Sequence, residues 1–164
     1  MSFAQKQGYL LENNIHSLIS RTKCKIFNEN EIVRMFGITC YGIDHLIETN
    51  DFDIFIQDKW TNTKPSLQMI RYFIGTVQTI NLVKNKPCYA IYLSKLPISS
   101  NALKAFFDEN IKQSIVKFIS FSDENMSNLM YKLSYWLYSN KIYYYDDSGD
   151  ESIIMLSEDI ALII

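Results

Sequence analysis

Apolar residues recur at the three- and four-residue spacing of an amphipathic helix in three long stretches of the chain. The first stretch covers residues 3–20 and carries Leu11, Ile15, Leu18 and Ile19. The second follows Pro65 and carries Leu67, Ile70, Ile74, Val77 and Leu82. The third covers residues 123–139 and carries Met126, Leu129, Met130, Leu133, Trp136 and Leu137. A shorter helix is expected over residues 29–36, with Asn28 or Asn30 as its N-cap.

Shorter apolar runs predict the strands. They cover residues 40–48, 52–59, 88–93 and 114–121. Because a turn of about three residues separates the first two runs, we expect them to pair as a hairpin. Two further elements are expected near the C-terminus: a helix that begins at Ser99 or Ser100 and reaches Phe107, and a second hairpin formed by residues 142–145 and 152–156.

The order of these elements predicts an α/β domain with a mixed central β-sheet flanked by helices. A chain of 164 residues, 48% of them apolar, is long enough to bury one sizeable core, so residues 1–164 are expected to form a single domain. No apolar run reaches the 18 residues of a membrane span, and residues 1–8 show no signal-peptide core. Three widely spaced cysteines favour a reduced, intracellular chain, cytoplasmic or, in a eukaryotic host, nuclear.

The net charge of −2 does not favour a nucleic-acid binder, but its distribution is uneven. Residues 54–118 contain 9 Lys and Arg against 3 Asp and Glu, a net charge of +6. Residues 119–164 contain 2 against 8, a net charge of −6. The middle third therefore has the composition of a basic surface; the alternative is that its charges are scattered over a solvated surface.

The candidate chemistry lies on the first predicted hairpin. Side chains alternate along a strand, so Gln57 and Lys59 share one face while Asp58 points to the other. If the hairpin pairs close to its turn, Asp44 meets Gln57 across the ladder, with Cβ atoms about 5 Å apart. Carboxylate and amide oxygens suit Mg²⁺, and a lysine stabilises charge on a phosphate. Glu12, at the edge of the apolar stripe of the first helix, adds a second carboxylate.

These pieces resemble the PD-(D/E)xK nuclease superfamily, in the Gln-x-Lys variant of Mrr-type restriction enzymes. The matching segments are Gly8-Tyr9-Leu10-Leu11-Glu12, Gly42-Ile43-Asp44 and Ile56-Gln57-Asp58-Lys59. The resemblance covers about residues 8–93 and implies a restriction-endonuclease-like core, with residues 94–164 as an added C-terminal helix and β-hairpin. It implies an endonuclease that hydrolyses phosphodiester bonds in DNA with Mg²⁺ or Mn²⁺.

The same resemblance assigns roles to residues. Glu12, Asp44 and Gln57 would bind the metal, and Asp44, Gln57 and Lys59 would be catalytic. His16 is a further candidate ligand, because some viral cap-snatching nucleases of this fold use a helix histidine. The chain departs from the family pattern where Gly42-Ile43 replaces proline before the aspartate and where Gln57 replaces an acid, which leaves the site one charge short.

Residues expected to contact DNA lie beside this hairpin and on the helix that follows it. On the helix, Gln68, Arg71 and Gln78 form a polar stripe that suits a phosphate backbone, with Lys64 just before it. Trp60 is expected to stack on a base. The alternative is a solvated helix face. A homodimer is expected from the need to cut both strands of a duplex, and the apolar side of residues 126–137 either pairs with a second copy or belongs to the core.

Each candidate also has a structural interpretation. Asp44 follows a turn glycine and can face solvent, Lys59 can extend from a strand end, and a glutamate such as Glu12 is ordinarily solvated. Asp53 shares the Gln57 face and can substitute for Asp44. The alternative function is therefore a catalytically inactive nuclease-fold module that binds nucleic acid or a protein partner. A third alternative is a structural or inhibitor protein whose acidic, tyrosine-rich tail docks on a basic partner.

Overall fold

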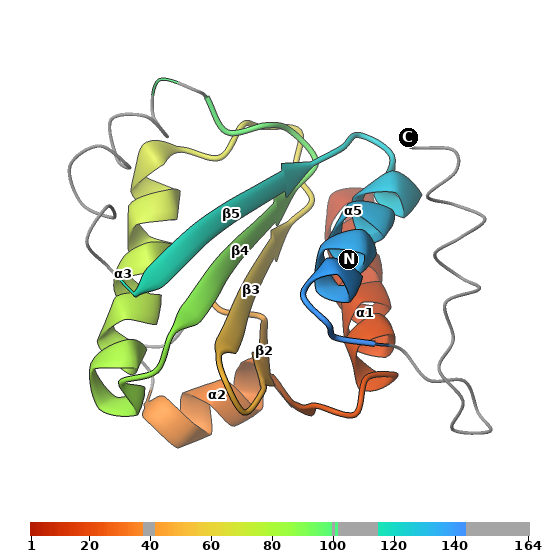
Figure 1. Cartoon of the computed structure of the whole chain (residues 1–164). Coiled ribbons are helices and arrows are strands. Elements are labelled where there is room, and N and C mark those ends of the chain that lie inside the picture. Colours follow the sequence, from red (N-terminus) through yellow and green to blue (C-terminus); the bar gives the residue numbers. More distant parts are fainter. Residues whose placement is uncertain (38–41, 100, 102–114, 144–164) are drawn as a thin grey trace.

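A five-stranded β-sheet lies between two layers of helices in the computed structural model of the chain, which describes residues 1–37, 42–99, 101 and 115–143 (Figure 1). The described helices are α1 (Phe3–Ser20), α2 (Glu29–Phe36), α3 (Leu67–Lys84) and α5 (Met126–Ser139). The strands are β1 (Lys25–Asn28), β2 (His45–Glu48), β3 (Asp53–Lys59), β4 (Cys88–Ser94) and β5 (Val116–Ser122). The expected α/β class with a mixed sheet is confirmed.

The strands follow one another across the sheet in chain order, from β1 to β5. The pairs β1–β2 and β2–β3 are antiparallel, whereas β3–β4 and β4–β5 are parallel. The expected hairpin is therefore present, and His45 lies opposite Ile56 at its open end. Helix α3 makes the crossover that parallel strands require, since β3 and β4 point the same way.

Alternation along the strands divides the core into two parts. Phe55 of β3 packs with α3 residues such as Phe73 and Ile74, and α2 joins that layer through Ile32. The neighbouring Ile54 and Ile56 instead pack against α1 and α5, which lie together on the other face of the sheet (Figure 1). The apolar side of α5 is thus part of the core, because Leu129, Leu133 and Leu137 are fully buried there.

Helix starts follow local side-chain chemistry. Ser2 and Gln5 form a capping box at α1, and Asn28 and Glu31 form one at α2. Ser66 accepts a hydrogen bond from the Met69 N–H at the start of α3. Such caps satisfy backbone N–H groups that lack partners in the first turn of a helix. The expected helices over residues 3–20 and 29–36 are confirmed to the residue.

Three expectations need correction. Strand β2 begins at His45 rather than at residue 40, since Gly42 turns the chain with a φ of 95° before the ladder starts. Leu82 is 84% exposed, and Ile80 occupies the buried position at that end of α3. Strand β1 was not predicted; Lys25 is exposed and its other three residues are only partly buried, so the strand carries little of the apolar pattern that identifies one.

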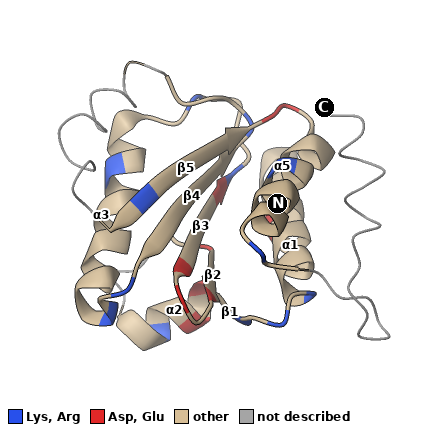
Figure 2. Ribbon diagram, viewed as in Figure 1, with Lys and Arg blue, Asp and Glu red and all other residues tan. Residues whose placement is uncertain are grey.

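Several expected elements lie outside the described residues: the helix expected up to residue 107 and most of the hairpin expected over residues 142–156. Figure 2 shows Lys and Arg distributed over several described elements, including α3 and β5, rather than gathered on one. Among the described helices, none combines the length and the apolar character needed to cross a membrane.

Candidate functional site

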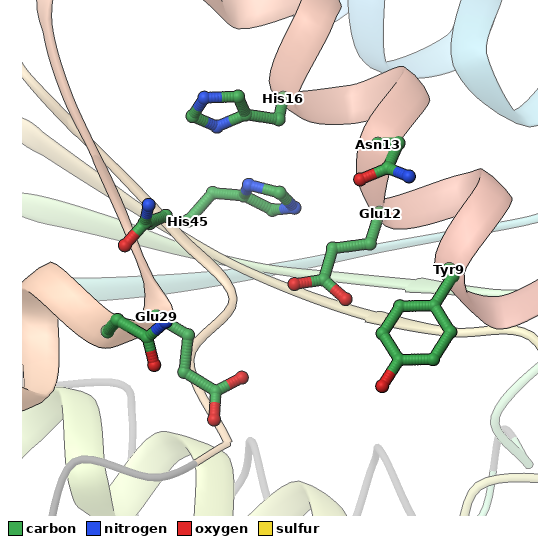
Figure 3. Close-up of a pocket in the computed structure, with 8 residues that line it drawn as sticks. Tyr9, Glu12, Asn13, His16, Glu29 and His45 are labelled. Carbon is green, nitrogen blue, oxygen red and sulfur yellow. The ribbon is translucent and has the colours of Figure 1, made fainter.

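An acidic cleft of about 450 Å³ opens beside α1 at the open end of the β2–β3 hairpin. Its lining comes from α1, from β2, and from the junction between β1 and α2: Tyr9, Glu12, Asn13, His16, Asn28, Glu29, Asn30 and His45. Figure 3 shows four side chains that reach the cleft from successive turns of α1: Tyr9, then Glu12 and Asn13, then His16. Residues far apart in the sequence therefore share one cavity.

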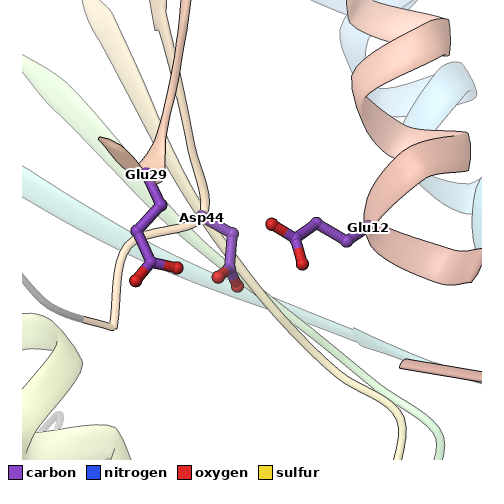
Figure 4. Close-up of side chains that lie close together, drawn as sticks. All are labelled: Glu12, Glu29 and Asp44. Carbon is purple, nitrogen blue, oxygen red and sulfur yellow. The ribbon is translucent and has the colours of Figure 1, made fainter. Parts of the chain in front are cut away.

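Three carboxylates meet beside this cleft: Glu12 and Glu29 line it, and Asp44 lies next to them. Glu12 comes from α1, Glu29 from the first residue of α2, and Asp44 from the segment just before β2. One carboxylate oxygen of each lies within 4.8 Å of the others, and all three side chains are partly buried. Figure 4 shows the carboxyl groups turned toward a common point. Hard, anionic oxygen donors are the ligands that Mg²⁺ and Mn²⁺ prefer.

Asp44 is held by its own backbone and by the next strand. Its N–H donates to the Ile56 carbonyl at 2.9 Å, and its Oδ2 accepts from the Asp58 N–H at 2.8 Å. Because Asp44 precedes the first residue of β2, the alternation of the ladder does not decide where its side chain points. Alternation predicted Asp44 on the same face as Gln57; the structure places it with His45 on the α1 side.

Burial, and after it the crowding of acids, raises proton affinity at this site. Burial raises the pKa of Asp44 to about 8, and the neighbouring Asp58 and Glu12 carboxylates act in the same direction. Burial likewise raises the pKa of Asp58 well above its usual value, with Glu12 and Glu29 adding to the effect. Desolvation and like charge both penalise the ionised form. Near neutral pH the cluster therefore retains protons or requires a cation to balance its charge.

His45 lines the cleft beside the carboxylates. It is 1% exposed, and its Nε2 is 2.9 Å from Asp58 Oδ2. Its ring stacks on that of His16, with 6.2 Å between centroids (Figure 3). Burial lowers the pKa of His45. A neutral imidazole beside a protonated carboxyl satisfies the contact with Asp58 without placing charge in the interior.

A second pocket, of about 390 Å³, lies on the α3 side of the same strand end. It is lined by Gly42, Gln57, Lys59, Ser66, Gln68, Met69 and Tyr72. Gln57 and Lys59 share this face as expected, while Asp58 points away from them. The Gln57 Oε1 atom is buried and has no hydrogen-bond partner among the described residues. This pocket carries one lysine and two amide side chains, in contrast to the acidic cleft.

The structure divides the predicted site. Glu12 and Asp44 lie together, as expected, but Gln57 and Lys59 line a pocket in which no carboxylate of the cluster takes part. The third carboxylate is Glu29, which sequence reasoning missed. A signal was available, since Glu29 follows the N-cap of a predicted helix. Its approach to Asp44, however, depends on the pairing of β1 with β2, which was not predicted.

Residues expected to contact DNA are also spread over two faces. Gln68 lines the α3-side pocket, Lys64 and Arg71 are exposed, and Gln78 is partly buried. Trp60 packs partly into the core between the sheet and α1–α5, with Lys95 Nζ 5.7 Å from its ring centroid. One side of the ring is therefore already covered by protein.

Asp53 does not substitute for Asp44. It is fully buried at the turn end of β3, where Lys84 Nζ lies 3.3 Å from Oδ2 and Lys86 Nζ 3.0 Å from Oδ1. A buried carboxylate needs such compensation, and both of its oxygens are engaged by lysines. The role of Asp53 is to anchor α3 and its following loop to the hairpin turn.

No protein-family model matches the chain, and no curated protein matches it. A crystal structure of a protein of unknown function, AF1548, is similar with a TM-score of 0.47 and 12% sequence identity. The similarity covers 77% of this chain and 66% of that protein's chain.

Proposed function

We propose that this protein is a metal-dependent nuclease of the restriction-endonuclease-like type, which hydrolyses phosphodiester bonds in DNA. The observation that carries the proposal is the convergence of Glu12, Glu29 and Asp44 from three separate elements within 4.8 Å. Burial raises the pKa of Asp44, and the like charges of Asp58 and Glu12 add to the effect, so its ionised form is costly at this position. A divalent cation bound here would offset that cost by balancing the carboxylate charge.

The donor set fits Mg²⁺ or Mn²⁺. All three donors are carboxylates, and the partial burial of each leaves room for water and substrate oxygens to complete the coordination. When bound, the cation would polarise a phosphate and lower the pKa of an attacking water. The third carboxylate supplies the charge that Gln57 lacks, so the replacement of an acid at that position does not leave the site short of ligands.

Lys59 and the amides of Gln57 and Gln68 serve the substrate rather than the metal in this proposal. They lie together on the α3 side of the strand end, next to the segment that carries Asp44. A DNA strand that crosses this end would place one phosphate at the carboxylates and a neighbouring phosphate at Lys59. The ammonium group would balance the charge of that phosphate, and the amide groups would orient it.

The direct test is cleavage of supercoiled plasmid with Mg²⁺, Mn²⁺ or EDTA. We expect nicking with either metal, none in EDTA, and none for Asp44→Ala or Glu29→Ala. Glu124→Ala removes an exposed acid outside the cluster and should cleave like the wild type. Equal cleavage by the Asp44, Glu29 and Glu124 variants would remove the cluster from the mechanism.

The second candidate is an inactive module that binds nucleic acid without cutting it. The separation of Lys59 from the carboxylates favours it, since nucleases of the resembled family use the two together. Calorimetry with Mn²⁺, alongside DNA binding by fluorescence anisotropy in EDTA, distinguishes the candidates. Metal-independent DNA binding without heat from Mn²⁺ supports the module; Mn²⁺ binding that is lost in Asp44→Asn supports the nuclease.

A homodimer remains part of the proposal, because two copies most simply cut both strands of a duplex. The apolar side of α5 is not available for this purpose, since it packs in the core. Sedimentation with and without a short duplex measures the oligomeric state. Double-strand breaks from a strict monomer would contradict a requirement for two copies.

A further inference from the structure

His45 is the most deeply buried polar side chain around the acidic cleft. It is 1% exposed, yet its Nδ1 has no hydrogen-bond partner among the described residues. An unsatisfied buried nitrogen costs stability, and an apolar side chain of similar size would avoid that cost. The imidazole therefore has a use other than filling the core.

Contacts of His45 lead to all three segments that carry the carboxylates. Its Nε2 is 2.9 Å from Asp58 Oδ2, and the Asp58 N–H in turn donates to Asp44 Oδ2 at 2.8 Å. Its ring stacks on His16, one helical turn from Glu12 on α1. In the ladder it lies opposite Asn28, the residue that precedes Glu29.

We propose that His45 is a positioning residue for the cation site: through Asp58 and His16 it holds Asp44 and Glu12 close enough to Glu29 for one divalent ion to bind all three. The inference rests on the metal site of the proposed function but not on cleavage of DNA. Mutual repulsion would otherwise spread the three carboxylates, because no Lys or Arg lines the cleft. Groups behind metal ligands typically change affinity about 10- to 100-fold when removed.

The His45–Asp58 contact is the part of this arrangement that single substitutions remove most directly. His45→Leu preserves apolar volume in the core but removes the contact. His45→Gln places an amide nitrogen near the position of Nε2 and retains a hydrogen bond to Asp58. On the other side, Asp58→Leu breaks the contact and Asp58→Asn keeps a partner for the imidazole. All four leave the backbone N–H of residue 58 available to Asp44.

The test is calorimetric titration of the full chain with Mn²⁺. We expect His45→Leu to raise the Kd for Mn²⁺ about 10- to 100-fold and His45→Gln to stay within about threefold of wild type. Thermal unfolding in EDTA shows whether each variant folds. A folded His45→Leu with wild-type Kd, or a His45→Gln as weak as His45→Leu, would overturn the proposal.

If His45→Leu does not fold, Asp58→Leu provides the test instead. Its Kd should rise as much, while Asp58→Asn should bind Mn²⁺ more tightly than Asp58→Leu; equal affinities for the two variants would overturn the proposal. The measurements also distinguish failure of the positioning role from failure of the proposed nuclease activity. Wild type that binds Mn²⁺ but does not nick plasmid contradicts the nuclease and leaves the positioning role in place, whereas wild type without Mn²⁺ binding removes both.

Discussion

The two sides of the β3 end differ in charge and in how their side chains are assembled. On the α1 side, Glu12, Glu29 and Asp44 come from three elements and meet only because the fold brings them together. On the α3 side, Gln57 and Lys59 are two residues apart on one strand, beside Gln68 at the start of the next helix. Nearby residues thus form the polar pocket, and distant ones form the acidic cleft. The proposed function assigns the cation to the acidic cleft and a substrate phosphate to the polar pocket.

The largest expected effect comes from removing the acidic side. Asp44→Ala should lower the rate of plasmid nicking roughly a thousandfold or more, since the metal supplies several kcal/mol of transition-state stabilisation. Rates of loss of supercoiled DNA at saturating Mg²⁺ measure it. Nicking by Asp44→Ala within about tenfold of wild type would mean that the cluster is not the catalytic centre.

Lys59→Ala tests whether the polar pocket and the acidic cleft act independently. We expect nicking to fall about 100-fold, because the neighbouring phosphate loses the ammonium group that positions the substrate at the carboxylates. The Kd for Mn²⁺ should stay unchanged, because Lys59 lies outside the carboxylate group. Single-turnover cleavage and calorimetry on the same preparation give both numbers. A parallel loss of metal affinity would show that the two pockets act as one site.

Proton binding tests the acidic side without substrate. The pKa of Asp44 is raised from its usual 3.8 to about 8, so the metal-free native state holds a proton that the unfolded state loses above pH 4. Stability in EDTA should therefore fall as pH rises from about 4 to 8, by up to about 1.4 kcal/mol per pH unit for this one group. The fall continues until the pH passes the folded pKa.

Chemical denaturation of wild type and Asp44→Asn at several pH values measures that slope. The variant should lose stability less steeply, and Asp58, whose pKa is also raised, should account for part of the slope that remains. Excess Mn²⁺ should flatten the wild-type curve. Identical slopes for the two proteins would mean that Asp44 titrates near its usual value.

The smallest effects are expected on the α3 surface. Lys64 and Arg71 are exposed, so each substitution to alanine should weaken DNA binding about equally across sequences and reduce the salt dependence by about one ion. Anisotropy with a labelled duplex at several salt concentrations measures it. Unchanged salt dependence in both variants would place the DNA elsewhere.

Much of the secondary structure was predictable from the sequence. Helical spacing and capping residues located α1 and α2 to the residue, and the short turn predicted the β2–β3 hairpin. Alternation correctly placed Gln57 with Lys59 and Asp58 on the other face. These features depend on neighbours within a few residues, and local backbone preferences are sufficient to decide them.

The composition of the acidic cluster was predictable only in part. Glu12 and Asp44 were expected together, but Glu29 was not, because the partly buried β1 that carries the chain to it has no clear pattern. The side chain of Asp44 also does not follow the alternation of the strand, because the turn at Gly42 leaves Asp44 outside the ladder. Side chains in such positions follow whichever hydrogen bonds the neighbouring strand offers.

By itself the sequence determined most of the described elements, the two faces of β3 and two of the three clustered carboxylates, Glu12 and Asp44. Only the tertiary structure decided which side chains meet. Pairing of β1 with β2 and packing of α1 on the sheet brought three carboxylates around His45, while the sheet kept Lys59 on its other side. Local interactions act over a few residues, whereas a site is assembled by long-range packing, which no short motif encodes.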